Sequence, residues 1–166
     1  MDLTKLADYN LWANDLTREK LSTLTEEEFS RDVIPPYGSI KNLVTHIVAA
    51  IEYNRINKVE GGKIEGDDLH GFLWRMSLEQ LLIHWREMDL WLKEFSSSYL
   101  DLKAVFPNFL GDGKIVVDHD EYLLQYLIHI VHHRAQVMSA LRLMGKEALG
   151  TDLLFYLSHA RLTDIN

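Results

Sequence analysis

Two histidines four residues apart, His129 and His133, are the side chains of this sequence best placed to do chemistry. They lie in a helical stretch that is apolar almost all round before His129, so its middle is expected to be buried. Residues four apart share one face of a helix. Two imidazoles on one helical face can bind the same metal ion, as they do in helical zinc sites. Buried without partners, each ring would cost roughly 1–3 kcal/mol, and a metal would satisfy both. Spacing alone leaves open a metal-binding pair and a hydrogen-bonded pair in the core.

A third ligand is expected from a neighbouring helix, and His46 is the best candidate. It lies in the middle of an apolar helical segment, where Ala49 and Ala50 leave room for the close approach of another helix. A single histidine within a helix is more often a hydrogen-bonded core residue, so this alternative stays open for His46. His132 is about 100° around the helix axis from His133 and is not expected to join the site. Surface or capping roles are expected for the remaining histidines, which are His70, His84, His119 and His159.

Four long helical segments are predicted to position these histidines. Ser39 is an N-cap candidate for the second segment, and Ser77 with Gln80 forms a capping-box pattern before the third. Four helices of this length make an all-α four-helix bundle the simplest architecture. The predicted segments are Asp2–Leu24, Ile40–Val59, Leu78–Phe95, and a fourth that Asp118 or Asp120 caps and Gly145 closes.

Shorter elements are expected between and after these helices. Thr25, followed by three glutamates, predicts the start of a short helix. The polar segment 63–75 is predicted to be a loop. Apolar runs on either side of Gly111-Asp112-Gly113 predict a small β-hairpin between Ala104 and Val117. A short last helix is expected around residues 152–159.

Length and composition limit the classes of protein to which this chain can belong. Its 166 residues fit one domain, 1–166, and the chain is acidic, with a net charge of −8 and no basic run. Nucleic acid is therefore not an expected partner. The absence of cysteine excludes disulfides and thiolate ligands. Neither a signal peptide nor a membrane span is expected, so the predicted location is the cytoplasm.

Several motifs resemble those of the DinB-like superfamily, in order and over nearly the whole chain. They are Tyr9-Asn10-Leu11-Trp12-Ala13-Asn14, then Gly38-Ser39-Ile40 with His46, then His129 to Gln136, and Thr151 to Leu157. The resemblance implies a four-helix bundle with a divalent metal ion on His46, His129 and His133, and a homodimer. The family usually has glycine where this chain has Ala135, which implies a slightly wider helix contact there.

The chemistry implied by the resemblance concerns small molecules. Some relatives are thiol-dependent transferases that use low-molecular-weight thiols such as bacillithiol or mycothiol. Three imidazole ligands suit several metals, with zinc or nickel the leading choices, and leave a position open for a thiol or a water molecule. A metal-dependent hydrolase and a non-enzymatic metal-binding module stay open as alternatives. Asn10, Asn14 and Gln136 are polar candidates for orienting the ligands or the substrate.

Overall fold

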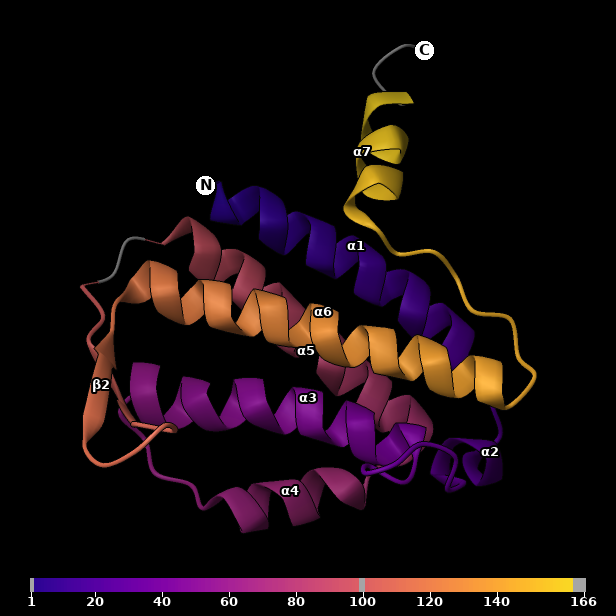
Figure 1. The fold of residues 1–166 in the computed structure, drawn as a ribbon, viewed down its shortest axis with the longest axis horizontal. Helices are drawn as coiled ribbons and strands as arrows, with labels where there is room; N and C mark the ends of the chain where they lie inside the picture. The colour runs from indigo at the N-terminus through magenta and orange to yellow at the C-terminus, as the bar shows by residue number, and fades with distance from the viewer. Residues whose placement is uncertain (1, 99–100, 163–166) are drawn as a thin grey trace.

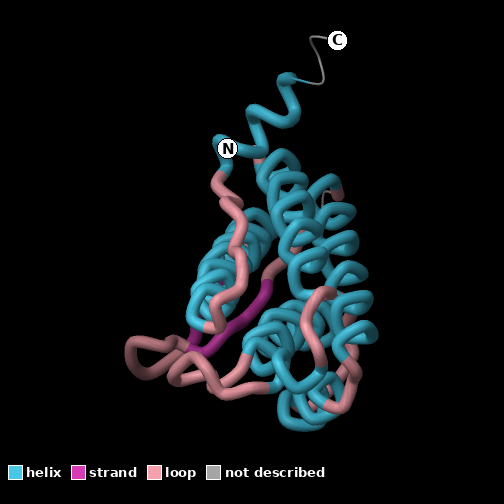
Figure 2. The backbone as a smooth tube through the Cα atoms, turned by 90° about the vertical axis from the view of Figure 1, so that its right-hand side faces the viewer, coloured by secondary structure: helices cyan, strands magenta, loops and turns pink. Residues whose placement is uncertain are grey.

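The computed structural model describes residues 2–98 and 101–162, and four long helices make up about half of them (Figure 1). The helices pack as the pairs α1–α5, α1–α6, α3–α5 and α3–α6. A small antiparallel hairpin of β1 (Ala104–Pro107) and β2 (Lys114–Val117) lies at one end of this bundle (Figure 1), and Figure 2 draws its strands in magenta. The predicted all-α four-helix bundle with a small β-hairpin is therefore confirmed. Its long helices are α1 (Leu3–Leu21), α3 (Ile40–Asn54), α5 (Leu78–Ser97) and α6 (His119–Leu143).

Side-chain caps explain where these helices begin. The Ser39 hydroxyl accepts a hydrogen bond from the backbone N–H of Asn42 at the start of α3, and Ser77 closes its predicted capping box with Gln80 before α5. Asp118, rather than Asp120, caps α6, and it forms a second capping box with Glu121. The α1 helix ends three residues earlier than predicted, at Leu21, because the chain turns there toward the short helix α2 (Glu26–Ser30).

The core is formed by one apolar stripe from each long helix. Leu43, Ile47 and Ile51 of α3 are fully buried, as their spacing predicts, and Trp85 of α5 is the largest fully buried side chain. The α6 helix differs from the expectation that its middle is buried all round. Its Ile128 is 56% exposed, so this helix has an apolar outer face as well as a buried inner one.

The loop predicted for residues 63–75 is wrong, because α4 (Gly66–Trp74) occupies most of it. Two glycines and a start without a side-chain cap gave this segment a weak helical signal. Its stability comes from tertiary packing instead. Leu69 and Leu73, four residues apart, are both buried, and α4 packs along α3.

Two further segments complete the described chain. The predicted second helix continues past Asn54 as one π-helical stretch, η1 (Arg55–Val59). The last helix, α7 (Leu153–Leu162), projects away from the bundle and touches it mainly through α1 (Figure 1). Among the described residues, no helix is both long enough and apolar enough to cross a membrane. The one-domain organisation and the cytoplasmic location stay predictions.

Candidate metal centre

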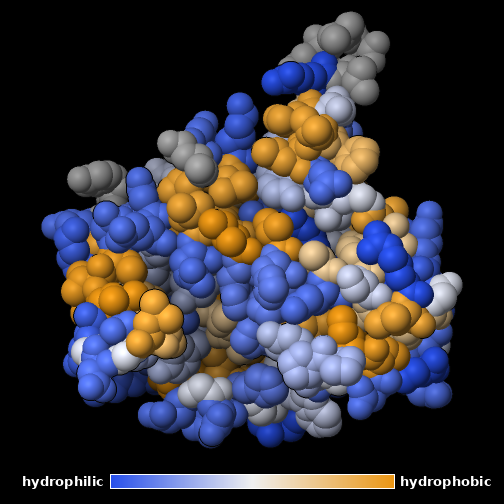
Figure 3. Space-filling view, in the orientation of Figure 1, coloured by the Kyte–Doolittle hydropathy of each residue, from blue (hydrophilic) through white to orange (hydrophobic). Residues whose placement is uncertain are grey.

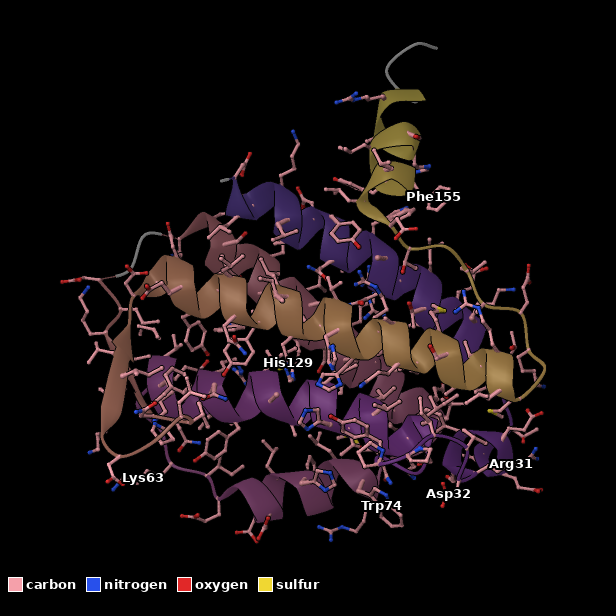
Figure 4. The ribbon with its side chains drawn as sticks, viewed as in Figure 1. Arg31, Asp32, Lys63, Trp74, His129 and Phe155 are labelled. Carbon is pink, nitrogen blue, oxygen red and sulfur yellow. The ribbon has the colours of Figure 1, made fainter. Side chains whose placement is uncertain are left out.

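The structure brings His46, His129 and His133 together between α3 and α6. Each offers a ring nitrogen, and these nitrogens all lie within 4.8 Å of one another. The ring centroids are 4.3 Å apart for His129 and His133, 4.6 Å for His46 and His133, and 5.2 Å for His46 and His129. In Figure 4 His129 extends from α6 into the space between α6 and α3. Among residues 2–98 and 101–162, this is the one cluster of three or more such side chains with metal-binding geometry.

Helix geometry accounts for this convergence. One turn of α6 separates His129 from His133 and places both rings on the side that faces α3. Across from them, His46 lies on α3 just beyond its buried stripe, so its ring is only half-buried. The ring of Tyr37, in the turn before α3, packs against His46 at 5.7 Å and edge-on against His133 at 5.4 Å. Tyr37 thereby closes one end of the cluster.

Hydrogen bonds identify which nitrogens are free to bind a metal. The Nδ1 of His133 lies 2.6 Å from Oε1 of Gln136, and it donates to this acceptor when the amide is oriented with its oxygen toward the ring. This contact leaves Nε2 of His133 as the ligand atom, in the arrangement that oriented histidine ligands commonly show. The Nε2 of His129 is buried and has no hydrogen-bond partner among the described residues. An unpartnered buried nitrogen beside two further imidazoles fits a metal ion.

The protonation states also favour metal binding. Burial, together with the smaller like-charge effect of the neighbouring histidines, lowers the pKa of His129 to about 4. Burial likewise lowers the pKa of His46 and of His133 below the ordinary histidine value. Neutral imidazole is the form that coordinates metals. At neutral pH the three rings are therefore deprotonated, with their lone pairs available.

One side of the cluster opens into a pocket of about 640 Å³. His46 forms part of its wall, and α4 forms the opposite wall. The indole N–H of Trp74, at the end of α4 in Figure 4, donates to Oδ1 of Asn42 and thereby ties the two walls together. The lining contains no carboxylate; its residues are Tyr37, Asn42, His46, His70, Gly71, Trp74 and Arg75. A small molecule in this pocket would lie beside one of the three candidate ligands.

The other histidines lie outside the cluster. His132 is exposed on α6, where its Nε2 lies 3.3 Å from the amide nitrogen of Gln136. His84 bonds Glu52 and Glu87, and the Glu52 hydrogen bond raises the His84 pKa. His70 is exposed, as expected, and it also lines the pocket beside the cluster. Its place in the pocket wall does not follow from a loop, whereas a helix places His70 and Trp74 on one face.

Of the three polar candidates for orienting the ligands, only Gln136 contacts the cluster. Asn10 and Asn14 instead accept hydrogen bonds from Nη1 of Arg134, each at 2.9 Å, in the buried contact between α1 and α6. Asn14 also donates to Asp89 of α5. These asparagines therefore join three helices of the bundle. Ala135, where a helix contact was expected, is exposed.

Comparisons with known proteins agree with this fold. The DinB family model matches residues 1–164. A DinB-family protein of Exiguobacterium sibiricum superposes with a TM-score of 0.67 at 18% identity, covering 92% of this chain and 99% of its own. A DinB-like protein of Bacillus cereus superposes with a TM-score of 0.56 at 20% identity, covering 84% and 90%. No curated protein matches the chain. A family model that matches almost every residue decides the assignment: the chain belongs to the DinB family.

Proposed function

We propose that this protein is a metal-dependent enzyme that holds one divalent ion, zinc or nickel, on His46, His129 and His133. The reaction we propose is the transfer of a low-molecular-weight thiol to an electrophilic small molecule. The observation that carries the proposal is the open side of the cluster, where the His46 wall leads into the pocket of about 640 Å³. Small-molecule sites commonly have volumes of about 300–1,000 Å³.

When bound, a divalent ion supplies positive charge that makes a thiol bind as the thiolate at neutral pH. The residues of the chain do the rest of the work. Gln136 fixes the ring of His133, while Tyr37 packs against the rings of His46 and His133. On the pocket side, Trp74 and Asn42 hold the walls at a fixed separation through their hydrogen bond.

The charged groups around the pocket favour thiol transfer over hydrolysis. A hydrolase needs a general base or acid within hydrogen-bonding reach of the reacting water. The pocket lining contains no Asp or Glu, so His70 is its strongest candidate base besides His46. Glu52, elsewhere on α3, is already engaged by His84 and Arg55. A thiol held as its thiolate needs no separate base, and this matches the lining better.

The same residues allow two alternative functions. A metal-dependent hydrolase would use His70 as its base. A non-enzymatic metal-binding module would close the site with a fourth protein ligand, as structural zinc sites do. Among the described residues, the cluster contains three such side chains and no fourth. This open arrangement favours either enzymatic function over the binding module.

His70→Ala is expected to separate the two enzymatic reactions. If the metal-loaded protein transfers thiols, the variant should keep its rate within a few-fold, because the thiolate needs no base. If the protein is a hydrolase, loss of a general base should reduce the rate by about 10²–10⁴-fold. The measurement is the metal-dependent rate of conjugation of bacillithiol, mycothiol or cysteine to an electrophile, compared with ester hydrolysis. A wild-type protein without metal-dependent thiol conjugation across this panel would refute the transferase.

We further propose a homodimer, as the family resemblance implies. Support comes from apolar side chains exposed on the described surface, which gather over α6 and α7 in Figure 3. Ile128 on α6 and Leu154 on α7 are 56% and 75% exposed. Association would remove such side chains from water. Sedimentation equilibrium at tens of micromolar should give twice the chain mass, and Ile128→Lys should shift the protein toward monomer. A wild-type monomer at that concentration would contradict the proposal.

A further inference from the structure

We infer that a second pocket, between the β-hairpin and the helices α3 and α6, is a binding site for an uncharged aromatic small molecule. The pocket has a volume of about 610 Å³. None of the three clustered histidines lines it, and neither does any residue of the pocket beside His46. The inference therefore does not depend on a bound metal.

Five of the twelve residues that line the pocket are aromatic. Tyr53 comes from α3, Tyr122 and Tyr126 from successive turns of α6, and Phe106 from β1. The Tyr122 and Tyr126 rings lie 4.9 Å apart, and Phe106 approaches Tyr122 at 6.4 Å. Rings at such separations offer faces and edges against which another aromatic ring can pack. The wall therefore selects a flat, apolar ligand.

The hairpin turns one apolar face toward this pocket. Phe106 and Ile115 are paired across the two strands, and both line the pocket. The next pair, Val105 and Val116, points to the opposite face and is exposed, as strand alternation requires. Phe109, in the turn, also lines the pocket although its side chain is 79% exposed. A ligand at this mouth would cover an aromatic ring that otherwise faces water.

The charges around the pocket favour a neutral ligand. Lys58 and Glu121 contribute one charge of each sign, so they offer little net attraction for an ion. The Lys58 ammonium already lies over the Phe106 ring, 5.6 Å from its centroid. Burial raises the pKa of Tyr122 and of Tyr126, which keeps both phenols uncharged. A charged ligand would lose its hydration and would meet a like charge as well as an opposite one.

The same two helices build this pocket and the histidine cluster. Tyr126 precedes His129 on α6 by three residues, and Tyr53 follows His46 on α3 by seven. At a rise of about 1.5 Å per residue, these separations are about one and two helical turns. A ligand in the pocket would lie along the same pair of helices as the metal ligands, on their hairpin side.

A fluorescent probe that is aromatic and uncharged tests the inference. N-phenyl-1-naphthylamine should bind the wild-type protein with a rise in fluorescence, equally in zinc-loaded and chelator-treated samples. Ile115→Trp places an indole inside the pocket and should weaken binding about ten-fold or more, which corresponds to about 1.4 kcal/mol. Val116→Trp is the matched control, because it adds the same indole on the outer face of the same strand. Its affinity should stay within two-fold of wild type.

A second variant fills the same pocket from outside the hairpin, so the test does not depend on how Ile115→Trp affects hairpin folding. Gln125→Trp enters the pocket from α6, where the side chain is exposed, and should weaken the probe in the same way. Circular dichroism and metal content should match the wild type in both variants. If either folded filling variant binds the probe as tightly as wild type, the inference is wrong. Equal loss in Val116→Trp would also overturn it, because the probe would then bind outside the pocket.

Discussion

Replacing His129, His133 or His46 by alanine is expected to remove nearly all of the divalent ion that the wild-type protein binds. Each substitution deletes one of three imidazoles whose nitrogens lie within 4.8 Å of one another. Two remaining ligands on a half-buried site bind metal weakly. The measurement is zinc and nickel content after equilibration with each metal and gel filtration. In each variant, loss of metal should accompany retained helical circular dichroism.

Thermal stability gives a second readout of the same site. Metal that binds only the folded protein stabilises it by about 2.7 kcal/mol when the free metal is a hundred times its Kd. A chelator should remove this increment from the wild type and leave the melting temperature of the three variants unchanged. The site would be contradicted if neither the metal content nor the melting temperature of the wild-type protein changed on addition of the chelator.

Two neighbours on α6 provide graded controls. His132→Ala should keep the full metal content, because that ring is exposed and lies outside the cluster. Gln136→Ala should keep the site but weaken it by about 10–100-fold, since it releases the ring of His133. Loss of metal in His132→Ala with retention in His133→Ala would contradict the site, because it would mean that His132, and not His133, faces α3.

The histidine cluster could be predicted because it depends on regular helix geometry. A four-residue spacing within one long helix determines that His129 and His133 share a face, whatever the rest of the fold. His46 could be proposed as a neighbour from its place in an apolar helix, although its approach to the pair depends on packing between helices. The family motifs identified the same three residues. Here local pattern and tertiary structure agree.

The pocket wall could not be predicted, because α4 has little helical signal of its own. Its Gly66 and Gly71 disfavour a helix, and burial of Leu69 and Leu73 against α3 compensates. That compensation exists only once α3 is in place. When residues 63–75 are predicted as a loop, His70 is not expected in the pocket wall. It is the one candidate base on the wall that α4 forms. The exposed outer face of α6 was missed for a related reason, since an apolar side chain does not reveal whether a partner covers it.

Asn10 and Asn14 show a second limit of reasoning from the sequence. Their polarity within a helix suggested a role at the site, but their actual partner, Arg134, lies more than a hundred residues away along the chain. The Arg134 guanidinium also donates to the Tyr9 hydroxyl at 2.8 Å, and that hydroxyl donates to the backbone oxygen of Thr151. Arg134 is 1% exposed and is thus an almost fully buried cation. Tyr9, Asn10 and Asn14 of the N-terminal motif therefore bind this arginine.

Arg134→Met is accordingly expected to destabilise the fold strongly while leaving the histidine cluster chemically intact. It keeps an apolar stem of similar length but removes the donors on which Asn10, Asn14 and Tyr9 depend. Removing one member of a buried charged network costs about 3–5 kcal/mol. For a chain of this size, that loss lowers the melting temperature by roughly 6–20 °C. Thermal and urea unfolding of the metal-free protein are the measurements.

Arg142→Met on the same helix is the matched control, because this arginine is exposed in the last turn of α6. Its loss should change stability by no more than about 1 kcal/mol. Similar unfolding of the two variants would mean that the buried hydrogen bonds of Arg134 contribute little. The double variant Arg134→Met, Asn14→Leu extends the test. Without the cation, the Asn14 oxygen has already lost its donor, so the further cost of Asn14→Leu is confined to the hydrogen bonds that its amide nitrogen donates to Asp89. The double variant should therefore be less destabilised than the sum of its single substitutions, as expected for residues that share one network.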